Sequence, residues 1–230
     1  MRKLPEKVLH VGYSGNDPWM LPILSAVNGA INREKIKDIS STKSLGNLSL
    51  SISRKLDFIP IIIYRLNKNT AELLSHVSKR NKKNDKYAFE VNEWLVHKIL
   101  IDIDSFLFEI NSCCELMREL VEKIMGYLGA IDFDFVSFVR SISEENKIDT
   151  MWFTLLNTER NYFMHNYAPY IDIDISDASK YDILIQKENL HEYLDIEKFI
   201  RLNEFDTIVQ NFQKIRQLIQ KKLIEILTKE

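Results

Sequence analysis

The sequence predicts an all-α protein: an antiparallel helical bundle with a small β-hairpin appended to it. Gly 6 and Pro 5 are low counts for 230 residues, whereas a β-sandwich or barrel needs many turns. Apolar residues recur at helical spacing over long stretches, and this pattern is longest between residues 87 and 128. Only the region 170–186 changes to the alternating pattern of strands. These observations favour helices packed around a common core.

The composition narrows the class of protein further. Hydrophobic residues make up 45% and charged residues 28%, which is ordinary for a globular chain. A net charge of -2 disfavours a uniformly basic nucleic-acid coat protein, so any contact with nucleic acid would be local. No apolar run approaches the roughly 20 residues that a membrane span needs. The adjacent Cys113 and Cys114 cannot form a disulfide framework. We therefore expect a cytoplasmic protein.

The N-terminal region differs in character from the rest of the chain. Residues 1–50 contain glycine and proline early, then the Ser/Lys-rich stretch DISSTKSLGNLSLS, and they predict a partly irregular extension with a short helix near 20–34. Residues 51–230 are expected to form the bundle and its hairpin. Within this part, 52–78 is helical in pattern despite Pro60, and KRNKKNDK at 79–86 indicates a solvated basic connector.

The middle of the chain predicts three helices. The helical pattern from 87 to 128 exceeds the usual length of roughly 10–14 residues, so we expect one long bundle helix or two separated by a kink. Gly126 and Gly129 mark its end. A further helix fits 134–146. Asp149 is a suitable N-cap for a helix over 150–167, which Pro169 would end.

The C-terminal part predicts the hairpin and a last helix. YIDIDIS (170–176) alternates apolar and polar residues, and YDILIQ (181–186) is rich in β-formers. The segment 196–228 predicts an amphipathic helix. Its basic outer face would either hold an RNA backbone or be a solvated surface, and consists of Lys214, Arg216, Lys221 and Lys222.

Common cofactor and metal motifs are absent from the sequence. There is no glycine-rich phosphate loop, no G-x-G-x-x-G, no H-E-x-x-H and no pair of C-x-x-C motifs. No two of the five histidines are spaced three or four residues apart, so a local helical metal site is not predicted. We expect neither a cofactor nor a bound metal.

The segment LNTERNYFMHNYAPY (156–170) concentrates polar side chains in a predicted helix. A stripe within an arc of about 100° holds Thr154, Asn157, Thr158, Asn161 and His165. Asn161 lies one turn before His165, where its amide could fix the imidazole tautomer. Arg160 lies about 140° from His165 on the helix. A two-fold dimer would let one site draw these side chains from both chains.

Arg160-Asn161-Tyr162-Phe163-Met164-His165 resembles the R-N-x-x-x-H motif of HEPN domains (higher eukaryotes and prokaryotes nucleotide-binding). The resemblance could cover roughly residues 55–167 and the last helix. It implies a metal-independent endoribonuclease that acts as a homodimer, with the motifs of both subunits facing one cleft, in a toxin–antitoxin or other defence system. Tyr167 extends the match to R-x4-H-x-Y. This longer form is similar to HEPN toxins whose nucleotidyltransferase antitoxin adds AMP to the tyrosine.

The motif residues suit metal-free cleavage of RNA. The 2′-OH attacks the adjacent phosphate, which requires a base, an acid and positive charge at the phosphorane. Histidine titrates near neutrality, so His165 is the candidate for proton transfer, an effect typically worth about 10²–10⁴ in rate. Arginine stays protonated and grips phosphate with a planar fork, so Arg160 would stabilise charge. Asn161 would orient these groups. The expected products carry a 2′,3′-cyclic phosphate and a 5′-hydroxyl.

Two alternatives remain open on the sequence alone. A stripe at near-heptad spacing, formed by Lys98, Asp102, Ser105, Glu109 and Ser112, is either a solvated helix face or a source of accessory carboxylates. In the second case Asp102 or Glu109 would steer Arg160 or His165. The whole protein is either the ribonuclease or a catalytically inactive HEPN-like dimer that binds a nucleotide, RNA or a protein.

Overall fold

A computed structural model describes residues 17–36, 41–79, 91–165, 170–177, 180–186 and 198–229. Its helices are α1 (Met20–Asn32), α2 (Ser41–Lys79), α3 (Glu93–Tyr127), α4 (Phe135–Glu145), α5 (Met151–His165) and α6 (Glu204–Thr228). Its strands are β1 (Tyr170–Asp174), β2 (Asp182–Gln186) and β3 (Phe199–Arg201). The chain is therefore mostly helical with a small antiparallel sheet, as the sequence predicts.

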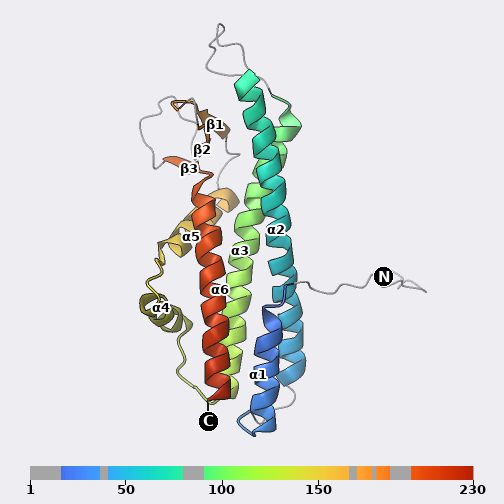
Figure 1. The fold of residues 1–230 in the computed structure, drawn as a ribbon, viewed down its shortest axis with the longest axis vertical. Coiled ribbons are helices and arrows are strands. Elements are labelled where there is room, and N and C mark those ends of the chain that lie inside the picture. The colour runs from blue at the N-terminus through green and yellow to red at the C-terminus, as the bar shows by residue number, and fades with distance from the viewer. Residues whose placement is uncertain are drawn as a thin grey trace, which may run out of the picture.

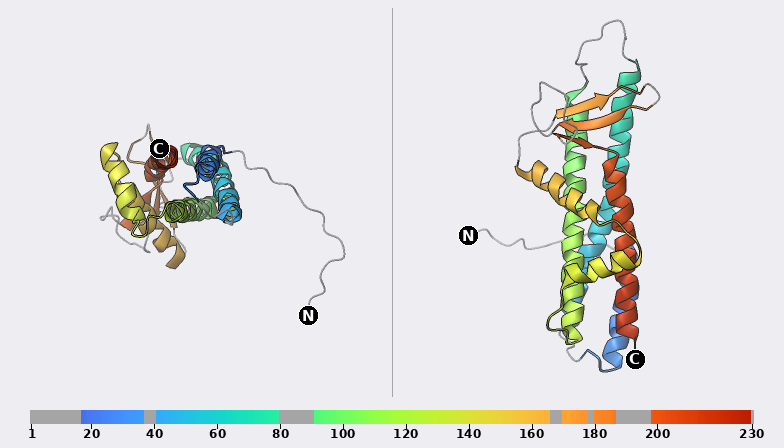
Figure 2. Two further views of the ribbon diagram at one scale, coloured as in Figure 1. Left: turned by 90° about the horizontal axis from the view of Figure 1, so that it is seen from below. Right: turned by 90° about the vertical axis from the view of Figure 1, so that its left-hand side faces the viewer.

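The long helices α2, α3 and α6 run side by side along the molecule, and α1 lies beside the lower half of α2 and α6 (Figure 1). Helix α2 is antiparallel to α3, but α6 runs in the same direction as α3 (Figure 1). The bundle is thus not strictly antiparallel. The reason is that α4, α5 and the sheet carry the chain back to the upper end before α6 begins, and α4 and α5 lie across the outside of α3 and α6 (Figure 2).

The region predicted as an N-terminal extension contains helix α1 and the start of α2. Helix α1 confirms the helix expected near 20–34, and its buried Ile23, Val27 and Ala30 join the common core. Helix α2 begins at Ser41 and passes through residue 50 without interruption. The Ser/Lys-rich stretch is helical there because Leu45, Leu48 and Ile52 recur at helical spacing and are buried. The described residues of the N-terminal region therefore belong to the bundle.

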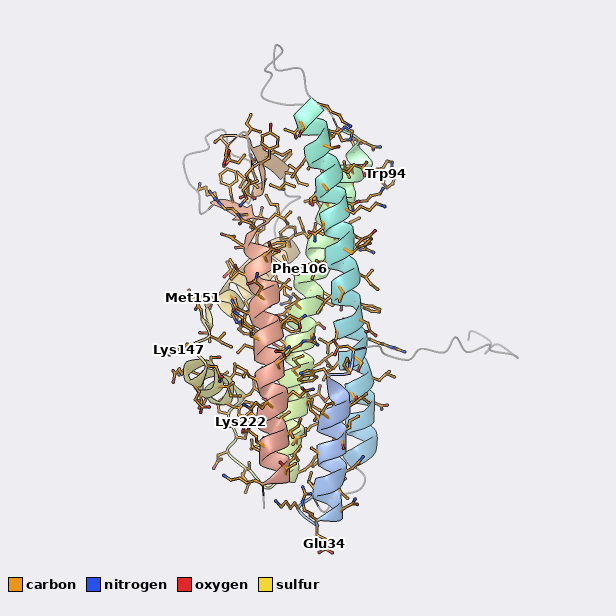
Figure 3. The ribbon with its side chains drawn as sticks, viewed as in Figure 1. Glu34, Trp94, Phe106, Lys147, Met151 and Lys222 are labelled. Atoms are coloured by element: carbon orange, nitrogen blue, oxygen red, sulfur yellow. The ribbon has the colours of Figure 1, made fainter. Side chains whose placement is uncertain are left out.

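Helices α2 and α3 form the long hairpin at the centre of the structure. Helix α2 continues through Pro60, whose side chain is exposed. Helix α3 is one uninterrupted helix that begins after Asn92, whose side chain accepts a hydrogen bond of 3.0 Å from the Trp94 amide. In the core, the Phe106 ring (labelled in Figure 3) stacks on Phe205 of α6 with 5.0 Å between ring centroids. The predicted connector from residue 80 onward lies outside the described residues.

The ends of the middle helices follow the capping signals in the sequence. Gly129 adopts a φ of 85° after the end of α3, and its amide donates to the Gly126 carbonyl at 3.0 Å. Asp134 caps α4 by accepting from the Val136 and Ser137 amides. Asp149 accepts from the Met151 amide at 2.8 Å and caps α5.

The sheet has one strand more than predicted. Strands β1 and β2 pair antiparallel, with Ile171 opposite Ile185, which confirms the hairpin. Strand β3 then pairs with β2 along its other edge, although its residues were expected to begin the last helix. Phe199 and Ile200 are buried there, and β2 satisfies their backbone groups. Helix α6 consequently begins at Glu204 rather than near residue 196.

Among the described residues, no helix combines the length and the apolar content that crossing a bilayer requires.

Candidate functional site

Helix α5, which carries the R-N-x-x-x-H motif, packs against α3 and α6. Trp152 and Leu156 are buried beneath it. Farther along the helix, the Tyr162 hydroxyl donates a hydrogen bond of 3.2 Å to the Gln186 carbonyl of β2. The motif therefore lies where the bundle meets the sheet. The C-terminal end of α5 extends beyond α3 at the side of the molecule (Figure 2).

Arg160 is a half-buried cation without a bonded partner in the part of the chain that the structure describes. Its Nε atom is buried and makes no hydrogen bond, and none of its guanidinium nitrogens forms an ion pair with a described residue. A desolvated charge without a partner is costly, and such a group is stabilised when an anion binds to it. Arg160 is therefore a candidate anion receptor.

Asn161 lies on the exposed side of α5, next to Arg160 in sequence. Thr154 and Thr158 are exposed on the same stripe, which confirms that this side of the helix is polar and reaches solvent. By its angle on the helical wheel Arg160 lies outside this stripe, and its side chain is half-buried. His165 is the last residue of α5, but its side chain and the whole of Tyr167 lie outside the described residues.

The carboxylates of the α3 stripe face α2. Asp102 is only 3% exposed, so the expectation of a solvated face is wrong at this position. Its two oxygens accept from the Arg65 guanidinium and, at 3.0 Å, from Nδ2 of Asn69. Glu109 forms an ion pair of 2.8 Å with Lys55. The bonded partners of both candidate accessory residues are thus on α2.

Near-heptad spacing explains this outcome. A repeat close to seven residues describes a polar helix face, but it also describes the seam between two long packed helices. Sequence reasoning missed Lys55, Arg65 and Asn69, which provide the other half of that seam. These three residues are spaced ten and four residues apart along α2. This spacing was the signal in the sequence that could have identified them.

The residues of the predicted basic face of the last helix differ in their exposure. Lys214 and Lys221 are exposed. Arg216 is half-buried, and its guanidinium forms an ion pair of 2.8 Å with Asp17 and donates to Gln213. Arg216 therefore joins Asp17, the first described residue, to α6 through this ion pair. It does not belong to an outer basic surface.

The two cysteines are free and pack within the bundle. Cys113 is fully buried, and burial raises the pKa of its thiol to about 12. Burial also raises the pKa of the half-buried Cys114 well above its ordinary value. Since the thiolate is the reactive form, neither side chain is a candidate nucleophile.

Within the described ranges, no group of three or more His, Cys, Asp and Glu side chains is arranged to hold a metal ion. Comparison of the chain with protein-family models, curated proteins and solved structures finds no match.

Proposed function

We propose that the protein is a metal-independent endoribonuclease of the HEPN type, acting in a toxin–antitoxin or other defence role. The half-buried guanidinium of Arg160, which has no bonded partner among the residues that the structure describes, carries this proposal. In the proposed reaction the 2′-oxygen attacks phosphorus, the bond to the 5′-oxygen breaks, and a cyclic phosphate and a 5′-hydroxyl result. Arg160 stabilises the phosphorane charge, His165 transfers protons and Asn161 orients the reacting groups.

The position of Arg160 supports a role in phosphate binding. An arginine that served only to stabilise the fold would be expected to find a carboxylate or carbonyl, as Arg65, Arg118 and Arg216 do. Arg160 has no such partner among the described residues, although its Nε is buried. A phosphate oxygen would supply the missing acceptor.

We propose that the active form is a homodimer, because the single motif histidine of each chain, His165, cannot serve as both acid and base in the same step. The α2–α3 hairpin offers a surface for the second copy. On α3, Trp94, Ile101 and Phe108 are exposed at a spacing of seven residues, and Trp94 points outward from the upper part of the helix (Figure 3). On α2, Phe58 and Ile61 are exposed as well.

Two contacts relate the exposed apolar side chains of α3 to those of α2. Nζ of Lys55 lies 4.9 Å from the centre of the Phe108 ring, which sets Phe108 at the border with α2. The Arg65–Asp102 ion pair aligns the segment around Ile101 with the segment around Ile61. Groups of exposed apolar side chains mark interaction surfaces. We name this set (Phe58, Ile61, Trp94, Ile101 and Phe108) the hairpin patch.

Cleavage is tested with the purified full chain and end-labelled RNAs of varied sequence, in buffer that contains EDTA. We expect fragments with 2′,3′-cyclic phosphate ends. Removing one charge-stabilising donor typically costs about 10²–10³ in rate, so Arg160→Ala should lower the rate by that factor. His165→Ala should abolish detectable cleavage. The control variants Arg33→Ala and His76→Ala change exposed side chains on α2 or at the end of α1, outside the motif, and should cleave at the wild-type rate.

The dimer is tested by sedimentation equilibrium. Ile101→Asp places a charge in the hairpin patch and should yield monomers that do not cleave RNA. Ile131→Asp is the matched control, because Ile131 is 94% exposed on the turn after α3 and lies outside the patch. A monomeric wild-type protein, or an active Ile101→Asp monomer, would contradict the composite site.

One observation favours a second function, a catalytically inactive dimer that binds a nucleotide, RNA or a protein. Arg160 is half-buried whereas Asn161 is exposed, so these two motif residues do not face the same direction. If the folded wild-type dimer cleaves none of the RNAs yet binds one of them, with affinity lost in Arg160→Ala, this second function is the correct one. A nucleotidyltransferase antitoxin that modifies Tyr167 would be revealed by an added AMP mass after co-expression.

A further inference from the structure

A pocket lies between α4 and the bundle, at the opposite end of α5 from the motif histidine. It has a volume of about 300 Å³ and is bounded by α3, α4, α5 and α6. Apolar side chains form most of its wall, including Met117, Phe135, Val139, Trp152, Phe212 and Ile219. Small-molecule sites typically occupy about 300–1,000 Å³ and have mainly apolar walls, so this pocket has the size of a small-ligand site.

Helix α4 leaves its apolar side only partly covered. Of its eleven residues, only Ile142 and Ser143 are buried. Phe135 and Val139 face the bundle across the pocket but are only half-buried, and Val136 is exposed. Because a globular protein gains stability by burying such side chains, a ligand between α4 and α5 would complete the contacts that α4 lacks.

Three arginines border the pocket, and they differ in their partners. Arg216 is bonded to Asp17 and Gln213, and Arg118 is bonded to Glu115 at 2.6 Å. Arg140 is exposed and forms no hydrogen bond or ion pair with any residue in the described ranges. Arg140 is therefore the cation at this pocket that is available to a ligand.

One carboxylate near Arg140, that of Asp134, already has hydrogen-bond donors of its own. The nearest carboxylate at the start of α4 is Asp134, which accepts hydrogen bonds from the Ser137 and Val136 amides. Hydrogen bonds from Ser137, with a smaller contribution from the charge of Arg140, lower the pKa of the Asp134 carboxyl. Asp134 thus serves as the helix cap, and the guanidinium remains open to a second anion. The Thr150 and Thr154 side chains add hydroxyl groups to the pocket wall.

We propose that this pocket binds a small amphipathic carboxylate, a medium-chain fatty acid, with its chain between α4 and α5 and its carboxylate on Arg140. The apolar wall accounts for the chain. The guanidinium of Arg140, which has no bonded partner within the described ranges, accounts for the negative headgroup. This site is distinct from the R-N-x-x-x-H motif and does not depend on the proposed nuclease.

The test is isothermal titration of the full chain with decanoate, and with decanol and decyltrimethylammonium for comparison. We expect decanoate to bind with one site per chain and more tightly than either analogue. Arg140→Gln should weaken decanoate about fivefold, the effect of one exposed charge contact, and leave decanol unchanged. Lys147→Gln is the matched control, because Lys147 is an exposed cation on the turn between α4 and α5 outside the pocket (Figure 3).

A second variant tests the position of the chain. Val139→Trp fills the pocket and should abolish binding of decanoate while the helical circular dichroism stays unchanged. If that variant does not fold, the comparison of Arg140→Gln with Lys147→Gln decides, since both residues are exposed. The proposal is overturned if decanoate does not bind, if the three ligands bind equally, or if Arg140→Gln binds decanoate as the wild type does. Because no RNA is used, these outcomes are independent of nuclease activity.

Discussion

The Arg65–Asp102 pair between α2 and α3 allows a sharp test of how this seam stabilises the fold. The two side chains differ greatly in their surroundings, since that of Arg65 is 49% exposed and that of Asp102 only 4%. Removing either partner leaves the other behind, but the two remaining groups are not equivalent. A half-exposed guanidinium can recover water, whereas a buried carboxylate cannot.

The expected magnitudes follow from this asymmetry. Arg65→Ala leaves Asp102 with only the hydrogen bond from Asn69, and breaking a buried pair in this way should cost about 3 kcal/mol of unfolding free energy. Asp102→Ala removes the buried charge itself, so its cost should be about 1 kcal/mol. The double variant should also cost about 1 kcal/mol, which gives a coupling energy of about 3 kcal/mol between the two sites.

The assay is urea denaturation followed by far-UV circular dichroism. The control is Arg118→Ala, which removes an ion pair with Glu115 in which both side chains are about half exposed and should change stability by less than about 1 kcal/mol. If Arg65→Ala costs no more than Asp102→Ala, or if the two costs simply add, the reasoning from burial is refuted.

Three further predictions concern single residues. Gly129→Ala should destabilise by about 1 kcal/mol because of its φ of 85°, whereas Gly126→Ala, in open space on a helix, should stabilise by about 0.5–1 kcal/mol; thermal unfolding distinguishes these opposite signs. Desolvation raises the pKa of the Asp172 carboxyl in the native state, so the native protein binds that proton more tightly than the unfolded chain does. The Asp172→Asn variant should therefore gain no stability over the wild type at low pH, and it should gain stability as the pH rises through the carboxyl range. If the unfolding free energies of the two proteins depend on pH in the same way, this prediction is contradicted. Both cysteines should resist alkylation near neutral pH in the native state and react after denaturation, since burial raises both thiol pKa values; native labelling of Cys113 would disprove the assignment.

Local signals determined most of the helices and the hairpin of this protein. Helix ends depend on contacts within a few residues, so the sequence predicts them. The examples here are the capping side chains of Asn92, Asp134 and Asp149 and the left-handed turn at Gly129. The β1–β2 hairpin depends on alternation over short segments, which is likewise local.

Other features were decided only by the tertiary structure, because they depend on partners distant in sequence. Strand β3 exists because β2 offers a free edge, and nothing within Phe199–Arg201 itself specifies that pairing. Asp102 is buried because Arg65 and Asn69 meet it from α2, which its spacing along α3 cannot reveal. The motif around Arg160 could be recognised in the sequence. The burial of its Nε, away from any acceptor in the described part of the chain, depends on how α5 packs against α3 and α6.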